Sequence, residues 1–126
     1  MVYPIFNLGV GSCDESLFPS LFLYSSVFFD EPDLKHYLLY FNEKDYVDIS
    51  GDIYQAKGII EVSSWLRKIL PLRRKYHILF NPTGSQMLLN EVRAKYIESV
   101  SGLSSPEIVL EQIKFAKGCS TLKELL

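Results

Sequence analysis

Residues 76–87, with the sequence YHILFNPTGSQM, constrain the fold most, because a short apolar run gives way to a polar turn and then to a helical pattern. The turn contains Asn81 and Gly84, which favour the end of a strand, with Thr83 and Ser85 at the entrance of the next helix. Unpaired backbone N–H groups at the positive end of a helix dipole attract anions. The stretch predicts either a site for an anionic group or an ordinary strand-to-helix turn, and both interpretations stay open.

The length and composition of the chain predict one globular domain. Its 126 residues suffice for one core and leave no room for a second, so we expect a single domain over residues 1–126. The composition, 48% hydrophobic and 22% charged, is that of a folded protein. The net charge of −2 argues against a surface that binds duplex nucleic acid.

The two cysteines and the apolar segments indicate a cytoplasmic protein without a membrane partner. Cys13 and Cys119 lie at opposite ends of the chain, so they form neither a disulfide framework nor a metal motif. The most apolar stretch, residues 17–29, is shorter than the ~20 residues of a membrane helix. Acidic residues precede it, which argues against a signal peptide. We expect no cofactor and no metal.

The apolar periodicity predicts alternating strands and helices. Strands are expected over residues 2–8, 35–41, 46–49 and 77–80. Helices are expected over 53–70 and 85–100, and over the first half of 17–29, where a strand is also possible. A final helix is expected to begin with Ser105 as N-cap and Pro106 in its first turn, and to end at Gly118. This order favours an α/β fold, Rossmann-like, with a mostly parallel sheet and helices on both faces.

A second small-residue loop follows the first expected strand, with Gly9, Gly11 and Ser12. Right-handed crossovers in a parallel sheet would place this loop and the turn after residue 80 at the same edge. One phosphate-bearing ligand could then contact both.

The pair of loops resembles that of CARF domains, the CRISPR-associated Rossmann-fold sensors. The matching residues are Gly9, Gly11 and Ser12 in the first loop and Asn81, Thr83, Gly84, Ser85, Gln86 and Met87 in the second. The resemblance implies a stand-alone sensor that binds a cyclic oligoadenylate second messenger across a homodimer and cleaves or sequesters it, damping type III CRISPR antiviral signalling. The second loop lacks a further Gly and a Thr or Lys that the family pattern usually has.

Ring cleavage would need a 2′-hydroxyl held in line with the neighbouring phosphorus, together with donors and a cation that stabilise the developing charge. Ser12, Thr83 and Ser85 are candidates to position phosphates, and Asn81 and Gln86 to bind ribose or base. The sequence assigns no catalytic residue. A basic cluster precedes the last expected strand and either offsets a helix dipole or binds an anion; its members are Arg67, Lys68, Arg73, Arg74 and Lys75.

The remaining titratable residues predict no catalytic or metal site. We expect His36 and His77 to be histidines within strands. Asp45, Asp48 and Asp52 are expected to lie in a solvated loop, because they lack the spacing of a cation site.

Two other functions stay open besides the sensor. One is a different α/β enzyme or nucleotide-binding protein that uses the same phosphate loop. The other is a non-enzymatic interaction module, viral or encoded by a mobile element, in which residues 17–29 pack against a partner. Exposed aromatic side chains on that segment would favour it.

Overall fold

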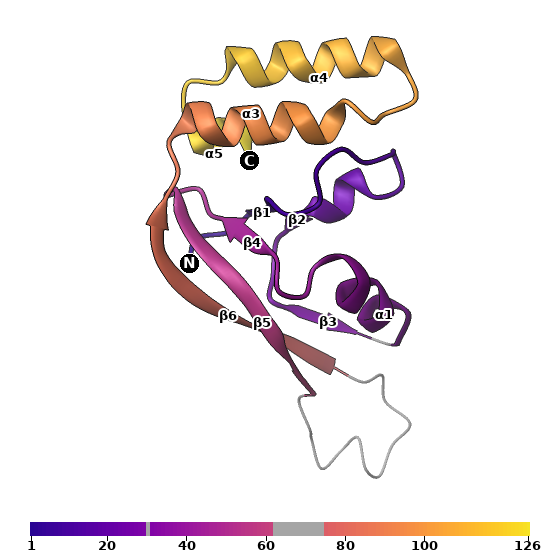
Figure 1. The fold of residues 1–126 in the computed structure, drawn as a ribbon, viewed down its shortest axis with the longest axis vertical. Coiled ribbons are helices and arrows are strands. Elements are labelled where there is room, and N and C mark those ends of the chain that lie inside the picture. The colour runs from indigo at the N-terminus through magenta and orange to yellow at the C-terminus, as the bar shows by residue number, and fades with distance from the viewer. Residues whose placement is uncertain (30, 62–74) are drawn as a thin grey trace.

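The computed structural model describes residues 1–29, 31–61 and 75–126. In these ranges the strands are β1 (Ile5–Asn7), β2 (Phe22–Leu23), β3 (Val27–Phe29), β4 (Asp45–Val47), β5 (Asp52–Glu61) and β6 (Lys75–Gln86). The helices are the 3-10 turn η1 (Phe18–Leu21) and the α-helices α1 (Glu31–Tyr40), α3 (Leu89–Val100), α4 (Pro106–Gly118) and α5 (Leu122–Leu125), as Figure 1 shows.

The strands form one curled sheet in the order β2-β1-β4-β5-β6-β3, and every neighbouring pair is antiparallel. The expected α/β fold with a mostly parallel, Rossmann-like sheet is therefore wrong. Parallel neighbours need a crossover connection, usually a helix. Residues 53–61, which were expected to begin such a helix, instead lie in the strand β5 at the centre of the sheet.

Both edges of the sheet come from one short segment. β2 and β3 stand at opposite ends of the strand order, yet only residues 24–26 separate them along the chain. Four Cα steps span at most about 14 Å, so the sheet has to curl until its two edges approach each other. The result is a half-barrel with a seam between β2 and β3 (Figure 1).

Helices pack on opposite faces of this sheet. The register of β1 with β4 places Phe6 and Tyr46 on opposite faces. Tyr96 of α3 contacts Phe6, with ring centroids 6.1 Å apart. On the other face Tyr37 of α1 stacks on Phe28 of β3 at 5.8 Å. These aromatic contacts form much of the core, which includes Tyr46 and Phe6 among its fully buried side chains.

Several elements agree with the sequence. The strands expected over residues 2–8, 46–49 and 77–80 are confirmed as β1, β4 and part of β6. The last helix is also confirmed, because α4 begins at Pro106 and ends at Gly118. The hydroxyl of Ser105 caps it by accepting the N–H of Ile108 at 3.4 Å.

Other elements were predicted wrongly. Residues 35–41 were expected as a strand, but residues 35–40 belong to α1. The first half of 17–29 forms only the 3-10 turn η1, after which the chain enters β2 and β3. The helix expected over 85–100 is confirmed as α3 and ends at Val100 as expected, and only its start differs, at Leu89. Of the helix expected over 53–70, residues 53–61 form β5, and 62–70 lie outside the described residues.

Candidate functional site

The first predicted loop, with Gly9, Gly11 and Ser12, packs against the C-terminal end of α3. The backbone N–H of Cys13, the next residue, donates to the carbonyl of Ser99 at 3.2 Å. A helix C-terminus carries the negative end of the dipole. The loop therefore does not meet the positive helix end that an anionic ligand prefers.

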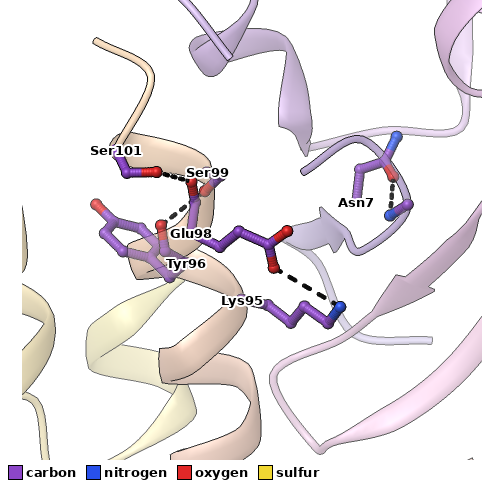
Figure 2. Close-up of polar contacts among 7 residues, drawn as sticks. Asn7, Lys95, Tyr96, Glu98, Ser99 and Ser101 are labelled. Atoms are coloured by element: carbon purple, nitrogen blue, oxygen red, sulfur yellow. Dashed lines mark hydrogen bonds and ion pairs between the residues drawn. The ribbon is translucent and has the colours of Figure 1, made fainter. Parts of the chain in front are cut away.

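The backbone at the start of this loop makes an internal contact. The N–H of Gly9 donates to the Oδ1 atom of Asn7 at 2.8 Å, and a Cβ on Gly9 would lie 2.7 Å from the Cδ atom of Lys44. Figure 2 shows the Asn7 side chain and, on α3, an ion pair in which Nζ of Lys95 lies 3.8 Å from Oε2 of Glu98. Gly9 and Ser12 are exposed, but the N–H of Gly9 is bonded to Asn7 and is not free to bind an anion.

The second predicted loop is part of a strand. Its five predicted residues all lie in β6: Asn81, Thr83, Gly84, Ser85 and Gln86. The hydroxyl of Thr83 donates to the carbonyl of Ile53 at 2.9 Å, and the side-chain amide of Gln86 donates to Oδ1 of Asp52 at 2.8 Å. These groups link β6 to β5 instead of facing a helix entrance.

The N-terminus of α3 lies close to the second group in sequence, but a carboxylate already faces it. Oε1 of Glu91 accepts the N–H of Leu88, the residue before the helix, at 3.2 Å. An acidic side chain in the first turn offsets the positive end of the dipole. A phosphate at this place would meet a negative charge.

The two predicted groups line separate hollows. Gly84, Ser85 and Gln86 line one of about 480 Å³ together with Asp52. Gly9 lines another of about 390 Å³, together with Lys44 and Lys95. The expected meeting of both groups above one edge depended on a parallel sheet, which the structure does not have. The two hollows are neighbours, because Ile53 lines both, and Met87 of the second loop lines the hollow of Gly9.

The other residues considered in the sequence have local structural roles where the structure describes them. Nε2 of His77 lies 2.6 Å from the hydroxyl of Ser26. Asp48 is buried, and its carboxylate accepts the N–H groups of Val2 at 3.1 Å and Ser50 at 2.9 Å. Within residues 1–29, 31–61 and 75–126, no three His, Cys, Asp or Glu side chains gather as a metal site.

Part of the basic cluster, namely Arg67, Lys68, Arg73 and Arg74, lies outside the described residues, and Lys75 opens β6. Anion binding by this cluster stays a prediction. His36 belongs to α1 rather than to a strand.

Both cysteines are buried and free. Burial, with a smaller contribution from Asp14, raises the pKa of the Cys13 thiol. Burial likewise raises the pKa of Cys119. A raised pKa lowers the fraction of reactive thiolate, so neither cysteine has the environment of a nucleophile.

A pocket that the sequence did not predict lies at the seam between the two edge strands. It has a volume of about 190 Å³. Phe22 of β2 and Phe28 of β3 line it from the two sheet edges, while Tyr37 of α1 and Ile78 of β6 complete its apolar lining. We call it the seam pocket. Its other lining residues are Ser20, Leu23, Ser25, Val27 and Phe41.

The seam pocket is uncharged at neutral pH, because none of the described residues that line it carries a charge. Its polar groups are the hydroxyls of Ser20, Ser25 and Tyr37. Burial raises the pKa of Tyr37 to about 12. The Tyr37 hydroxyl lies 3.4 Å from the Gly58 carbonyl and 3.3 Å from Oδ1 of Asn42, and it donates toward both. An apolar group fits this lining better than an ion does.

An exposed aromatic residue lies in the chain between two residues that line the seam pocket. Tyr24 is 73% exposed and lies in the chain between Leu23 and Ser25, which both line the pocket. Tyrosine combines a large apolar ring with a polar tip, which makes it common at protein interfaces. A larger hollow of about 710 Å³ beside α4 and α5 is more open, and half of its six lining residues are charged.

The comparisons with known proteins identify no relative: no protein-family model, no curated protein and no solved structure matches the chain. Across the described parts of the chain, no helix is both long and apolar enough to cross a membrane.

Proposed function

We propose that the protein is a non-enzymatic interaction module that binds an aromatic side chain of a partner protein in the seam pocket. The observation that carries this proposal is the apolar pocket between Phe22 and Phe28, with the exposed Tyr24 next in the chain to two of its lining residues. Among the functions open from the sequence, this is the one in which residues 17–29 pack against a partner. Interfaces concentrate aromatic residues and exclude charge at their centres, and the seam pocket has both properties.

The size of the seam pocket favours one side chain over a larger ligand. A cavity of ~150 Å³ accommodates benzene, and the seam pocket offers about 190 Å³. Sites for drug-sized molecules and cofactors usually need ~300 Å³ or more. One aromatic ring therefore fits, whereas a nucleotide does not.

The two sheet edges beside the pocket are poorly suited to accept an added strand. The N–H of Val27 in β3 donates to the hydroxyl of Ser25 at 3.2 Å. The N–H of Phe22 in β2 donates to the carbonyl of Pro19. Both edge strands are also short, which is a common defence against strand pairing. Recognition at the seam therefore has to use side chains.

A titration with p-cresol, which has the side-chain ring of tyrosine, tests the proposal. The Tyr24→Ser variant is used so that the exposed ring of the protein itself cannot compete. We expect saturable NMR shifts at Val27, Ile78 and the aromatic lining. Shifts that do not saturate, or that centre on the hollow beside α4, would refute the proposal.

Two further variants control this titration. Ser20→Phe adds an aromatic ring to the pocket lining, so it should abolish the NMR shifts caused by p-cresol. The fold should tolerate this change, because the Ser20 side chain donates no hydrogen bond to the described residues. Leu110→Ser changes a residue that is 68% exposed on α4, and it should leave the shifts unchanged. Both variants need native circular dichroism spectra.

Binding of a cyclic oligoadenylate by a homodimer is the second candidate. It is favoured by the shared hollow of Gly84, Ser85 and Gln86. It ranks second because Asp52 also lines that hollow and would repel phosphate. Calorimetry with cyclic tetra- and hexa-adenylate tests it. Ser85→Ala combined with Gln86→Ala should weaken any binding, and absence of heat with both rings would remove this candidate.

A further inference from the structure

We propose that a second copy of this chain occupies the seam pocket, with Tyr24 of each protomer inserted into the pocket of the other. This inference rests on the proposed function and names the partner. It requires that one chain carry both the inserted ring and the pocket that receives it. The chain does so within three consecutive residues, because Leu23 and Ser25 line the pocket and the exposed Tyr24 lies between them in the chain.

The adjacency of ring and pocket suits a two-fold axis. In a symmetric dimer, the same surface of both protomers meets, so that residue i contacts residue j and j contacts i. A protein surface that carries an exposed ring next to a pocket of similar size is complementary to the same surface of a second copy that is rotated by 180°. Tyr24 does not fill the pocket of its own chain, since it is 73% exposed.

The chemistry of the two parts also matches. The ring of an inserted Tyr24 would lie between Phe22 and Phe28, in a space of about 190 Å³. A buried tyrosine hydroxyl usually needs a hydrogen-bond partner. The hydroxyl of Ser20 lines the pocket and has no partner among the residues that the structure describes, so it is available to the incoming Tyr24 hydroxyl.

Charge does not oppose the contact. The described lining of the seam pocket has no ionised group, so no ion loses its water when the ring enters. Each chain carries a net charge of only −2, and salt screens the repulsion between two such chains.

Two inserted rings make a small interface, so we expect a weak dimer. Interfaces below ~1,200 Å² belong to weak or transient complexes. Self-association should therefore be visible over protein concentrations on the order of 10 µM to 1 mM. Tyrosine anchors in central pockets dominate such interfaces, so loss of Tyr24 should raise the dissociation constant at least ~10-fold.

Sedimentation equilibrium of the full chain tests the inference. The unmodified protein should associate to dimers, whereas Tyr24→Ser and Ser20→Phe should each be monomeric. An equimolar mixture of the two variants should regain weak association, because Ser20→Phe supplies the ring and Tyr24→Ser supplies the open pocket. Structural damage alone does not produce such recovery.

Matched variants and a competitor sharpen the result. Tyr24→Phe keeps the ring and should stay dimeric, and Leu110→Ser should behave like the unmodified chain. Addition of p-cresol to the unmodified protein should dissociate the dimer, which keeps the inference testable even if Ser20→Phe does not fold.

The outcomes separate this inference from the proposed function. A protein that is monomeric at all concentrations, or a dimer unaffected by Tyr24→Ser, overturns the inference. If p-cresol still binds the seam pocket of Tyr24→Ser, the proposed function stands and the partner is a different protein. If p-cresol does not bind there, both fall.

Discussion

Replacement of Gly51 by alanine should destabilise the fold strongly. Gly51 is buried and has a φ of +87°, a conformation that residues with a Cβ rarely adopt. Its carbonyl accepts the N–H of Met87 at 2.8 Å, so it joins the turn before β5 to the segment that enters α3. A Cβ at residue 51 would lie only 2.7 Å from the carbonyl oxygen of Met87.

Two costs add at this position. A left-handed conformation costs a residue other than glycine ~1–2 kcal/mol. Forcing an extra carbon into a packed site costs ~1–3 kcal/mol. We therefore expect Gly51→Ala to lower the free energy of unfolding by ~2–5 kcal/mol, a large part of the ~5–15 kcal/mol that a typical domain has.

Three other glycines separate the two costs. Gly84 has a φ of +78° and open space around its Cβ position, so Gly84→Ala should cost ~1–2 kcal/mol from strain alone. At Gly102 a Cβ would lie 2.7 Å from the carbonyl oxygen of Cys13, so Gly102→Ala should cost ~1–3 kcal/mol from contact. Gly118 has neither problem, and its replacement should stabilise the protein by ~0.4–1 kcal/mol.

Urea unfolding followed by circular dichroism measures all four free energies. Gly51→Ala should be the least stable variant, and its loss should approach the sum of the losses in Gly84→Ala and Gly102→Ala. If Gly51→Ala loses no more than Gly84→Ala, the close approach to Met87 contributes nothing and the reasoning is refuted.

Two further predictions concern α4 and the buried tyrosines. Arg93 donates to the carbonyls of Ala116 at 2.8 Å and Cys119 at 2.5 Å. Arg93→Ala should therefore lower the free energy of unfolding, measured by thermal unfolding, by ~1–3 kcal/mol. Arg93→Lys should restore less than half of that loss. Burial raises the pKa of Tyr37 and Tyr96 to about 12 from the model-compound value of 10.0. Their contribution to stability is therefore complete below pH 10 and lost as the pH rises to about 12, because the unfolded chain releases these protons first. Urea midpoints that stay constant over that range would contradict the second prediction.

The elements that the sequence predicted correctly have local signals. Ser105 and Pro106 mark the start of α4, and these signals depend only on backbone geometry and on the nearest residues. The helix also ends at Gly118 as predicted, although Gly118 does not adopt the left-handed conformation of a glycine cap. β1 and β4 were also predicted, because short apolar runs with turn residues beside them have few alternatives.

The topology depended on contacts that are distant in sequence. β5 pairs with β6 along most of its length, and the pair of Ala56 with Phe80 joins residues that no periodicity connects. The helical spacing read over 53–70 begins at Ile59, near the end of this strand. Residues 35–41 were read as a strand from their aromatic and apolar content, but strand propensity depends strongly on tertiary context. Tyr37 instead packs as a helical residue on β3.

The candidate site was missed for the same reason. Asn81, Pro82 and Gly84 have the composition of a turn, yet they continue β6 because the chain opposite them, from Asp52 to Gln55, provides a partner strand. The seam pocket draws its walls from five separate elements, and its existence follows from the curl of the sheet. The sequence offered only the aromatic content of residues 17–29, together with the hypothesis that this segment meets a partner.

Some residues that line the seam pocket also close the half-barrel. A test of binding therefore needs a substitution at a residue that does not take part in closure. Phe22 and Phe28 line the pocket, but they also belong to the two edge strands and pack on the core through Tyr96 and Tyr37. A substitution of either one changes the curl of the sheet together with the pocket, so loss of binding would not separate the two roles. Tyr24 lies between the edges and is 73% exposed, so it contributes little to closure. A binding defect caused by Tyr24→Ser in a natively folded protein therefore reports on recognition itself.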